Sequence, residues 1–414
     1  MINHDIVREA TRLTRAGQLM EATALLQRML RGEGVSEPSG STASAAPARL
    51  EPPTIDLKAN VVEERECRPP AQASSTPPRP KSPLRFDGMK DFSRLGLRGP
   101  IRRASPSASD IAPKGTTFIE GTFSNAAGSR TYKLFIPSRN QGKPLPLIVM
   151  LHGCTQSPDD FAAGTRMNFL AEEQNCFVAY PEQSSGANQA KCWNWFRKGD
   201  QQRGSGEPSL IAGITRQIMR DHAIDPKRVY VAGLSAGGAA AAIMAATYGD
   251  LYAAVGIHSG LACGAAGNLP SAFMAMRQGG GPEALVKVGS VVPTIVFHGD
   301  RDTTVHPDNG DRILEQSAKA TSPATKVLRG RVPDGHAYTR TIVTDQSGRV
   351  ISEHWNIHGA GHAWSGGSPA GSYTDPRGPD ATREMLRFFL ARKLPGDGAC
   401  HSTPGTGQAL TPPY

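Results

Sequence analysis

The stretch Val229–Gly238, with the sequence VYVAGLSAGG, constrains the fold of this chain more than any other. An apolar run ends at Gly-Leu-Ser-Ala-Gly, and a run of small residues, Ala239–Ala246, follows it. This pattern predicts a strand, a sharp turn and a helix, and the turn matches the G-x-S-x-G nucleophile elbow. Gly233 and Gly237 are needed because the strand and helix backbones approach closely there. The turn would present the Ser235 hydroxyl at a helix N-terminus, where backbone N–H groups can stabilise a developing anion.

Short apolar runs alternate with helical patterns along residues 116–394. The predicted strands are Phe118–Phe123, Thr131–Ile136, Leu145–Leu151, Cys176–Tyr180, Arg228–Ala232, Ala253–Ile257, Thr294–Phe297 and His354–Ile357. The predicted helices are Asn168–Asn175, Ser209–His222, Gly238–Tyr248, Asn309–Ala320 and Pro379–Lys393. Strands that alternate with helices predict an α/β fold with a mostly parallel, doubly wound sheet. Functional residues of such a sheet lie at the carboxyl ends of its strands.

The chain before the sheet has a different composition. Residues 1–31 carry apolar side chains at helical spacing around Gly17, which predicts an N-terminal helical hairpin. One hairpin cannot bury its own apolar face, so we expect it to dock on the sheet domain, another copy or a hydrophobic surface. Residues 32–115 are rich in Pro, Ser and Arg, and 13 of the 33 prolines fall in residues 36–115. This composition predicts a largely disordered linker, and residues 395–414 are expected to form a flexible tail.

The bulk composition argues against several function classes. The net charge is +9 in 414 residues, and the basic excess is mild in the sheet domain, which argues against a nucleic-acid-binding face. Six cysteines in a chain of this length do not make a disulfide scaffold, and no apolar stretch is long enough for a transmembrane segment. The first residues lack the apolar core of a signal peptide. We therefore expect a cytoplasmic or granule-associated protein, with export by a non-standard route as the alternative.

Two carboxylates follow the predicted strand Thr294–Phe297, in the sequence HGDRDTTVHP. A serine–histidine pair needs an anion that orients the imidazole and stabilises the imidazolium. We predict Asp302 for this role, because it lies beyond the tight turn in a loop that can reach across the sheet edge. Asp300 is expected to order the turn through its own backbone.

The glycine-rich stretch HGAGHAWSGG near the end of the domain carries the predicted general base. His362 is favoured over His358, because His358 ends the preceding strand and the flanking glycines give His362 freedom of approach. Its place completes the chain order Ser, Asp, His that is typical of α/β-hydrolases. The remaining candidates, which fit no role and are expected to be structural or exposed, are His258, His298, His306 and His336.

Two loops are predicted to complete the site. The loop after Leu145–Leu151 would offer the N–H of Cys154 as one oxyanion donor, and the N–H of Ala236 would be the second. The predicted substrate-binding residues are His152, Trp193, Trp195 and Trp364. The CWNWF tryptophans would form an apolar wall, and the alternative is that they pack to pin a long loop. The sequence does not determine whether Cys154 and Cys192 form a disulfide, although a reducing cytoplasm would keep both thiols reduced.

The motifs together resemble a known family. Between about Gly115 and Lys393 the chain resembles the polyhydroxybutyrate (PHB) depolymerase family of esterases, which is related to feruloyl and acetylxylan esterases. The resemblance lies in LHGCTQSPDDFAAGTRMN, CWNWF, GEPSLIAGITRQIM, the stretch from RVYVAGLSAGG to LACGAA, HGDRDTTVHP and GAGHAWSGG. It implies an α/β-hydrolase fold, a triad of Ser235, Asp302 and His362, and an oxyanion site at the Cys154 loop.

The resemblance also implies hydrolysis of short-chain or polymeric 3-hydroxyacyl esters. The expected reaction proceeds through an acyl-enzyme and needs neither a metal nor an organic cofactor. The expected partner is the ester substrate, and a storage-granule surface is a candidate partner. The nearest alternative is a feruloyl-type, acetylxylan-type or general short-chain carboxylesterase. A non-catalytic granule-binding protein is an alternative of a different class, which the complete set of triad residues argues against.

Overall fold

The computed structural model describes residues 105–280, 292–317 and 324–395. The predicted N-terminal hairpin, most of the predicted linker and residues 396–414 of the predicted tail lie outside the described residues. The last part of the predicted linker is described and contains helix α3 (Ala108–Ile111). Ile111 packs against the domain core, and its carbonyl accepts a hydrogen bond from Asn168 Nδ2 at 3.0 Å. The folded domain therefore begins ahead of the predicted boundary.

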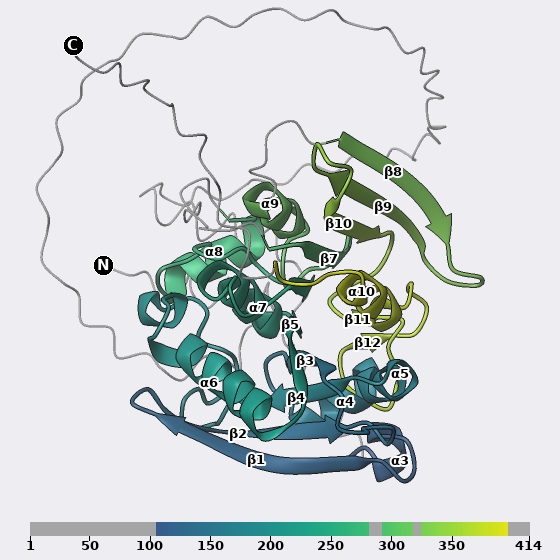
Figure 1. The fold of residues 1–414 in the computed structure, drawn as a ribbon. Helices are drawn as coiled ribbons and strands as arrows, with labels where there is room; N and C mark the ends of the chain where they lie inside the picture. The colour runs from purple at the N-terminus through teal and green to yellow at the C-terminus, as the bar shows by residue number, and fades with distance from the viewer. Residues whose placement is uncertain (1–104, 281–291, 318–323, 396–414) are drawn as a thin grey trace, which may run out of the picture. The chain divides into compact units, whose positions relative to one another are not determined.

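Ten strands in the described part of the chain form one sheet, in the order β1-β2-β4-β3-β5-β6-β7-β10-β9-β8. Their bounds are β1 Thr117–Asn125, β2 Gly128–Ile136, β3 Leu145–Leu151, β4 Phe177–Pro181, β5 Ile224–Leu234, β6 Ala254–His258, β7 Thr294–Gly299, β8 Ala324–Arg331, β9 Ala337–Thr344 and β10 Val350–Ile357. The six central strands, from β4 to β10, are parallel, and antiparallel hairpins flank them at both ends. Figure 1 shows the β1–β2 and β8–β9 hairpins at opposite ends of the sheet. The predicted mostly parallel sheet is confirmed.

Helices cover both faces of this sheet (Figure 1). Their bounds are α4 Pro158–Thr165, α5 Met167–Gln174, α6 Gly206–Asp221, α7 Ala236–Thr247, α8 Leu269–Gln278, α9 Asp308–Ser317 and α10 Ala381–Leu390. Successive side chains of a strand point to opposite faces, and β3 shows the consequence. Leu147 and Val149 enter a core shared with α6 and α7, whereas Ile148 and Met150 enter a core shared with α4, α5 and α10. Burial on both faces explains why the central strands are continuous apolar runs.

The β8–β9 hairpin is absent from the predicted elements. Most residues of β8 are exposed and all residues of β9 are half-buried, so neither strand has the apolar run or the clean alternation that marks a strand in sequence. β9 forms by antiparallel pairing with β10, and β8 forms by antiparallel pairing with β9. In the described part of the chain, no helix has the length and apolarity that a membrane span requires.

The carboxyl ends of the parallel strands lie at one edge of the sheet. β3, β5, β7 and β10 each lead at this edge into a loop or turn that carries predicted site residues. The fold therefore gathers segments that are far apart in the chain, from His152 after β3 to His362 after β10, in keeping with the general rule for parallel sheets.

Candidate active site

Ser235 occupies the sharp turn between β5 and α7, with φ 57° and ψ −119°. This backbone conformation is strained for a residue with a side chain and is typical of a nucleophile elbow. A Cβ on Gly233 would collide with the carbonyl of Gly237, and one on Gly237 would collide with that of Leu151. The Ser235 N–H donates to the carbonyl of His258 at 2.9 Å. The local sequence therefore folds as predicted and leaves the serine at the N-terminus of α7.

Asp302 and His362 are joined by a hydrogen bond. Nδ1 of His362 lies 2.7 Å from Oδ2 of Asp302, whose side chain has no exposed surface. Oδ1 of Asp302 accepts the N–H groups of Thr304 and Val305 at 2.9 Å each. Burial opposes ionisation of Asp302, but hydrogen bonds from His298 and His362 hold the pKa of this carboxyl well below its usual range. The pair therefore has an anion that orients an imidazole.

Ser235 is not joined directly to this pair. Among the described residues, none forms a hydrogen bond with Ser235 Oγ. The structure therefore joins two of the three predicted triad members, Asp302 and His362. His258 connects the two halves of the site. Its carbonyl holds the N–H of Ser235, and its Nε2 accepts the N–H of Ser365 at 3.0 Å, three residues beyond His362.

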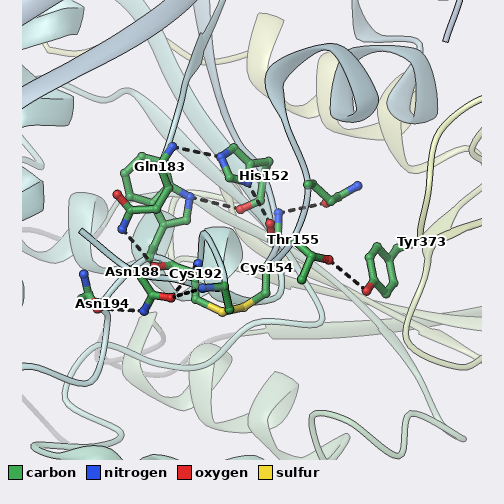
Figure 2. Close-up of a disulfide and its surroundings, with 12 residues drawn as sticks. His152, Cys154, Thr155, Gln183, Asn188, Cys192, Asn194 and Tyr373 are labelled. Carbon is green, nitrogen blue, oxygen red and sulfur yellow. Dashed lines mark hydrogen bonds between the residues drawn. A yellow bond between two sulfur atoms is a disulfide. The ribbon is translucent and has the colours of Figure 1, made fainter. Parts of the chain in front are cut away.

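The predicted oxyanion loop follows β3 and lies beside the serine. A Cβ on Gly153 would lie 3.6 Å from the Cβ of Ser235. The next residue, Cys154, forms a disulfide with Cys192 (Figure 2). Thr155 has a positive φ of 65°, which is unusual for a β-branched residue, and its N–H donates to the carbonyl of Ala190 at 2.7 Å. The disulfide and this hydrogen bond tie the loop to the CWNWF segment.

His152 is placed in the interior, not in a substrate surface. Its Nε2 accepts the N–H of Gln183 at 3.1 Å, and its Nδ1 lies 2.8 Å from the carbonyl of Gly153 (Figure 2). Since the backbone N–H is the donor at Nε2, the proton resides on Nδ1. Burial lowers the pKa of His152 to about 4, so the ring is neutral at physiological pH. His152 therefore braces the start of the predicted oxyanion loop.

The three tryptophans predicted to bind substrate, of which Trp193 and Trp195 were expected to form an apolar wall, are also interior. Trp193 is fully buried, and its Nε1 donates to the carbonyl of His152 at 3.1 Å. Trp364 is buried as well, and its Nε1 donates to Thr382 Oγ1 at 2.9 Å. Trp195 lies in the same core as Trp193, with 6% of its surface exposed. The expected wall is therefore not formed by these rings, and the alternative of packing that pins the loop describes them.

A buried polar network that the sequence reasoning missed holds the CWNWF segment. Glu207 accepts the backbone N–H and the Nδ2 of Asn194, each at 2.7 Å, and also a hydrogen bond from Gln183 Nε2. Arg130 Nη2 lies 3.5 Å from the same carboxylate. Gln183 Nε2 further donates to the carbonyl of Cys192 at 2.9 Å. Burial raises the pKa of Glu207, but these donors satisfy both of its oxygens.

Asp300 has a different role from the one predicted. Instead of ordering its own turn, it binds the segment before His362. Its Oδ2 lies 2.9 Å from Nδ1 of His358, and its Oδ1 accepts the N–H of Gly359 at 2.7 Å. The two aspartates of HGDRD therefore bind the same loop at two positions. Asp300 binds His358, and Asp302 binds His362, four residues after His358.

His298, which was expected to be structural or exposed, is a buried residue that contacts Asp302. Its ring is buried, and Nε2 lies 3.5 Å from Oδ2 of Asp302 and 2.9 Å from the carbonyl of Val305. The sequence could have indicated this contact, because His298 lies near the carboxyl end of β7, the strand that leads to Asp302. In the described part of the chain, no group of three or more His, Cys, Asp or Glu side chains is arranged to hold a metal ion.

Residues 130–325 match the family model described as esterase PHB depolymerase. This part, just under half of the chain, is similar to that family. The match includes the predicted oxyanion loop, the turn that carries Ser235, and Asp302, whereas His362 lies beyond the matched residues.

Relatives named as depolymerases or esterases match part of the chain. Poly(3-hydroxyalkanoate) depolymerase C of Paucimonas lemoignei is 34% identical over 233 residues, which are 52% of this chain and 54% of the relative. Poly(3-hydroxybutyrate) depolymerase of Ralstonia pickettii is 26% identical over 298 residues, which are 66% of this chain and 60% of the relative. A probable acetylxylan esterase A of Aspergillus clavatus is 28% identical over 202 residues, which are 45% and 64% of the two chains. The chain thus spans less than two thirds of the length of each.

A solved structure supports the fold. The acetyl xylan esterase from Aspergillus awamori matches with a TM-score of 0.51 and 18% identity, over 66% of this chain and 99% of that one. At this identity the likeness concerns the fold, which is that of an α/β-hydrolase.

Proposed function

We propose that the domain is a serine esterase that hydrolyses 3-hydroxyalkanoate esters, such as poly- or oligo-3-hydroxybutyrate. The observation that carries the proposal is the 2.7 Å contact between His362 Nδ1 and the buried Asp302 carboxylate. An imidazole oriented by a buried anion is the general base that a serine nucleophile requires. The match of residues 130–325 to the esterase PHB depolymerase family model supports the same reaction.

The proposed mechanism is acyl transfer. Ser235 Oγ attacks the ester carbonyl carbon while its proton moves to Nε2 of His362, and Asp302 stabilises the imidazolium. The N–H groups of Cys154 and Ala236 stabilise the oxyanion. The tetrahedral intermediate collapses when the bond to the alcohol oxygen breaks and His362 returns the proton to that oxygen. Water then attacks the acyl-enzyme with His362 as base, and the acid is released.

The choice of substrate rests on the relatives. Two of them carry the name of a poly(3-hydroxyalkanoate) or poly(3-hydroxybutyrate) depolymerase, and the first is 34% identical. The second candidate is an acetylxylan or feruloyl ester, because other relatives carry those names at 24–32% identity. Both substrates are carboxylic esters and would use the same residues.

A substrate panel with Ser235→Ala tests the proposal. The wild type should hydrolyse p-nitrophenyl butyrate and a 3-hydroxybutyrate oligomer, and Ser235→Ala should lose about 10³-fold or more of kcat. Ser347→Ala, in an exposed turn, is the matched control and should keep full activity. Cleavage of acetylated xylan or a feruloyl ester without cleavage of the oligomer would favour the second candidate. Folded wild type that cleaves no ester would support a non-catalytic binding protein.

The proposal also includes a cytoplasmic or granule-associated location, with a storage-granule surface as a partner. A cytoplasmic or granule-associated protein is expected from the sequence, whereas a disulfide such as Cys154–Cys192 persists best in an oxidising compartment. The test is to fractionate cells into granules, cytosol and exported protein, and to alkylate the free thiols in each fraction before and after reduction. The fractions show the compartment, and the alkylation shows whether Cys154 and Cys192 are disulfide-bonded. Protein that is absent from the granules, with Cys154 and Cys192 protected until reduction, would contradict the granule assignment.

A further inference from the structure

One fully buried histidine, His258 at the end of β6, contacts both halves of the site. We infer that His258 is a positioning residue, which fixes the nucleophile loop against the base loop through one backbone oxygen and one ring nitrogen. The inference rests on the proposed function, because it assigns Ser235 and His362 their parts in ester hydrolysis. It gives His258 no contact with substrate.

The backbone half of the link acts on the nucleophile. Leu234 and His258 are register partners in the parallel strands β5 and β6, so the ladder continues to the end of both strands. The next donor is the N–H of Ser235, which lies 2.9 Å from the carbonyl of His258. This hydrogen bond anchors the strained turn at the residue that carries the hydroxyl.

The ring half acts on the loop of the base. Nε2 of His258 accepts the N–H of Ser365 at 3.0 Å, across 107 residues of sequence. Because a backbone N–H is always a donor, Nε2 carries no proton and the proton resides on Nδ1. Nδ1 lies 3.2 Å from Ser259 Oγ, which accepts that proton. The neutral ring of His258 therefore accepts a hydrogen bond from Ser365, which lies three residues beyond His362.

The surroundings hold the ring in this state. It stacks on Phe297 at a centroid distance of 5.8 Å and on Trp364 at 5.2 Å, and it has no exposed surface. Burial lowers the pKa of His258 to about 3, and the proximity of His298 and His362 lowers it further, while Asp302 opposes this. The acceptor at Nε2 therefore persists across the pH range in which an esterase works.

Substitutions at His258 separate the acceptor from the aromatic stack. His258→Phe keeps a ring of similar size between Phe297 and Trp364 but removes the acceptor. His258→Gln removes the ring but can place its amide oxygen near the position of Nε2. We expect His258→Phe to lower kcat for p-nitrophenyl butyrate by about 10- to 100-fold with KM within about twofold, because a displaced base costs rate rather than binding. His258→Gln should retain kcat within about fivefold of the wild type.

His222→Phe is the matched control. His222 is the C-cap residue that follows α6, and it packs against Phe177, at the amino end of the parallel strands and away from the site. This variant should keep the wild-type kcat and KM. Thermal unfolding of every variant shows which of them are folded at the assay temperature.

The outcomes decide the inference separately from the proposed function. An active wild type with an equally active His258→Phe would overturn the positioning role and leave the esterase intact. Loss of kcat in folded His258→Gln as large as that in His258→Phe would also overturn it, since the stack and not the acceptor would matter. If His258→Phe does not fold, His258→Gln and His258→Met are compared, because their side chains have the same length and only glutamine carries an acceptor.

A higher kcat in His258→Gln than in His258→Met supports the inference. Equal kcat in the two variants, or failure of both to fold, overturns it. A wild type without esterase activity defeats the proposed function itself.

Discussion

Nδ1 of His362 lies 2.7 Å from Oδ2 of Asp302, and the two oxygens of that carboxylate have different partners. Oδ1 accepts two backbone N–H groups, those of Thr304 and Val305, so the side chain has a single orientation. A carboxylate at Nδ1 keeps the proton on that nitrogen and leaves the Nε2 lone pair to accept a proton from a serine. The chemistry proposed for His362 therefore depends on the anion.

Asp302→Asn should retain the geometry and reverse the tautomer. The amide oxygen would take the place of Oδ1, where it accepts the same two backbone N–H groups. The NH2 group would then face Nδ1 of His362 and place the imidazole proton on Nε2. We expect kcat for p-nitrophenyl butyrate to fall by about 10³- to 10⁴-fold with little change in KM.

Asp300→Asn is the matched control for this substitution, because Asp300 binds His358 in the same loop. Its effect on kcat should be less than about tenfold. Equal losses in the two variants would show that the loop, rather than the tautomer of His362, determines the rate.

The stability of the protein should depend on pH through Asp302. Burial opposes its ionisation, but hydrogen bonds from His298 and His362 hold its pKa below the usual range, so the folded state releases this proton more readily than the unfolded chain. Asp302 therefore contributes stability above the unfolded pKa of about 4, and this contribution is lost as the pH falls below it. We expect the urea midpoint to fall more between pH 6 and pH 3 in the wild type than in Asp302→Asn. Asp334→Asn, in an exposed turn, should follow the wild type; parallel curves for wild type and Asp302→Asn would contradict the assignment.

Loss of the disulfide should weaken both stability and activity. Cys154→Ser with Cys192→Ser opens a loop whose ends are separated by 38 residues, which lowers the free energy of unfolding by about 3–4 kcal/mol in the chain-entropy model. The oxyanion loop also loses its link to the CWNWF segment, so we expect kcat to fall by about tenfold. Denaturant unfolding and ester hydrolysis, each with and without dithiothreitol, measure the two effects.

Cys263→Ala is the control, since Cys263 is a buried free cysteine. Its activity should not respond to dithiothreitol differently from that of the wild type. A double serine variant with unchanged kcat would show that the remaining contacts of Thr155 suffice to hold the loop.

Trp193→Phe tests whether this ring packs the loop or contacts substrate. The variant keeps an aromatic ring in the core but loses the donor to the carbonyl of His152, which becomes a buried acceptor without that partner. We expect the free energy of unfolding to fall by about 1–3 kcal/mol, while KM for p-nitrophenyl butyrate stays within about twofold. A KM that rises tenfold at unchanged stability would restore the predicted substrate wall.

Local sequence determined the elements that the site is built on. The apolar runs of β3 and β7, and the strand, turn and helix around Ser235, are contiguous patterns whose physical causes lie within about ten residues. Burial on both sheet faces selects the runs, and close backbone approach selects Gly233 and Gly237. The choice of Asp302 and His362 as partners could also be made from sequence, because both follow strands whose carboxyl ends meet at one edge.

Only the tertiary structure decided the partners of the remaining side chains. Asp300 binds His358, 58 residues away, and His258 binds Ser365, 107 residues away. The rings of Trp193 and Trp364 are interior because distant segments cover them, although their local sequence has the appearance of an exposed aromatic loop. Hydrogen bonds and burial between such segments depend on how strands and loops are placed in space, and a pattern confined to a few neighbouring residues does not contain that information.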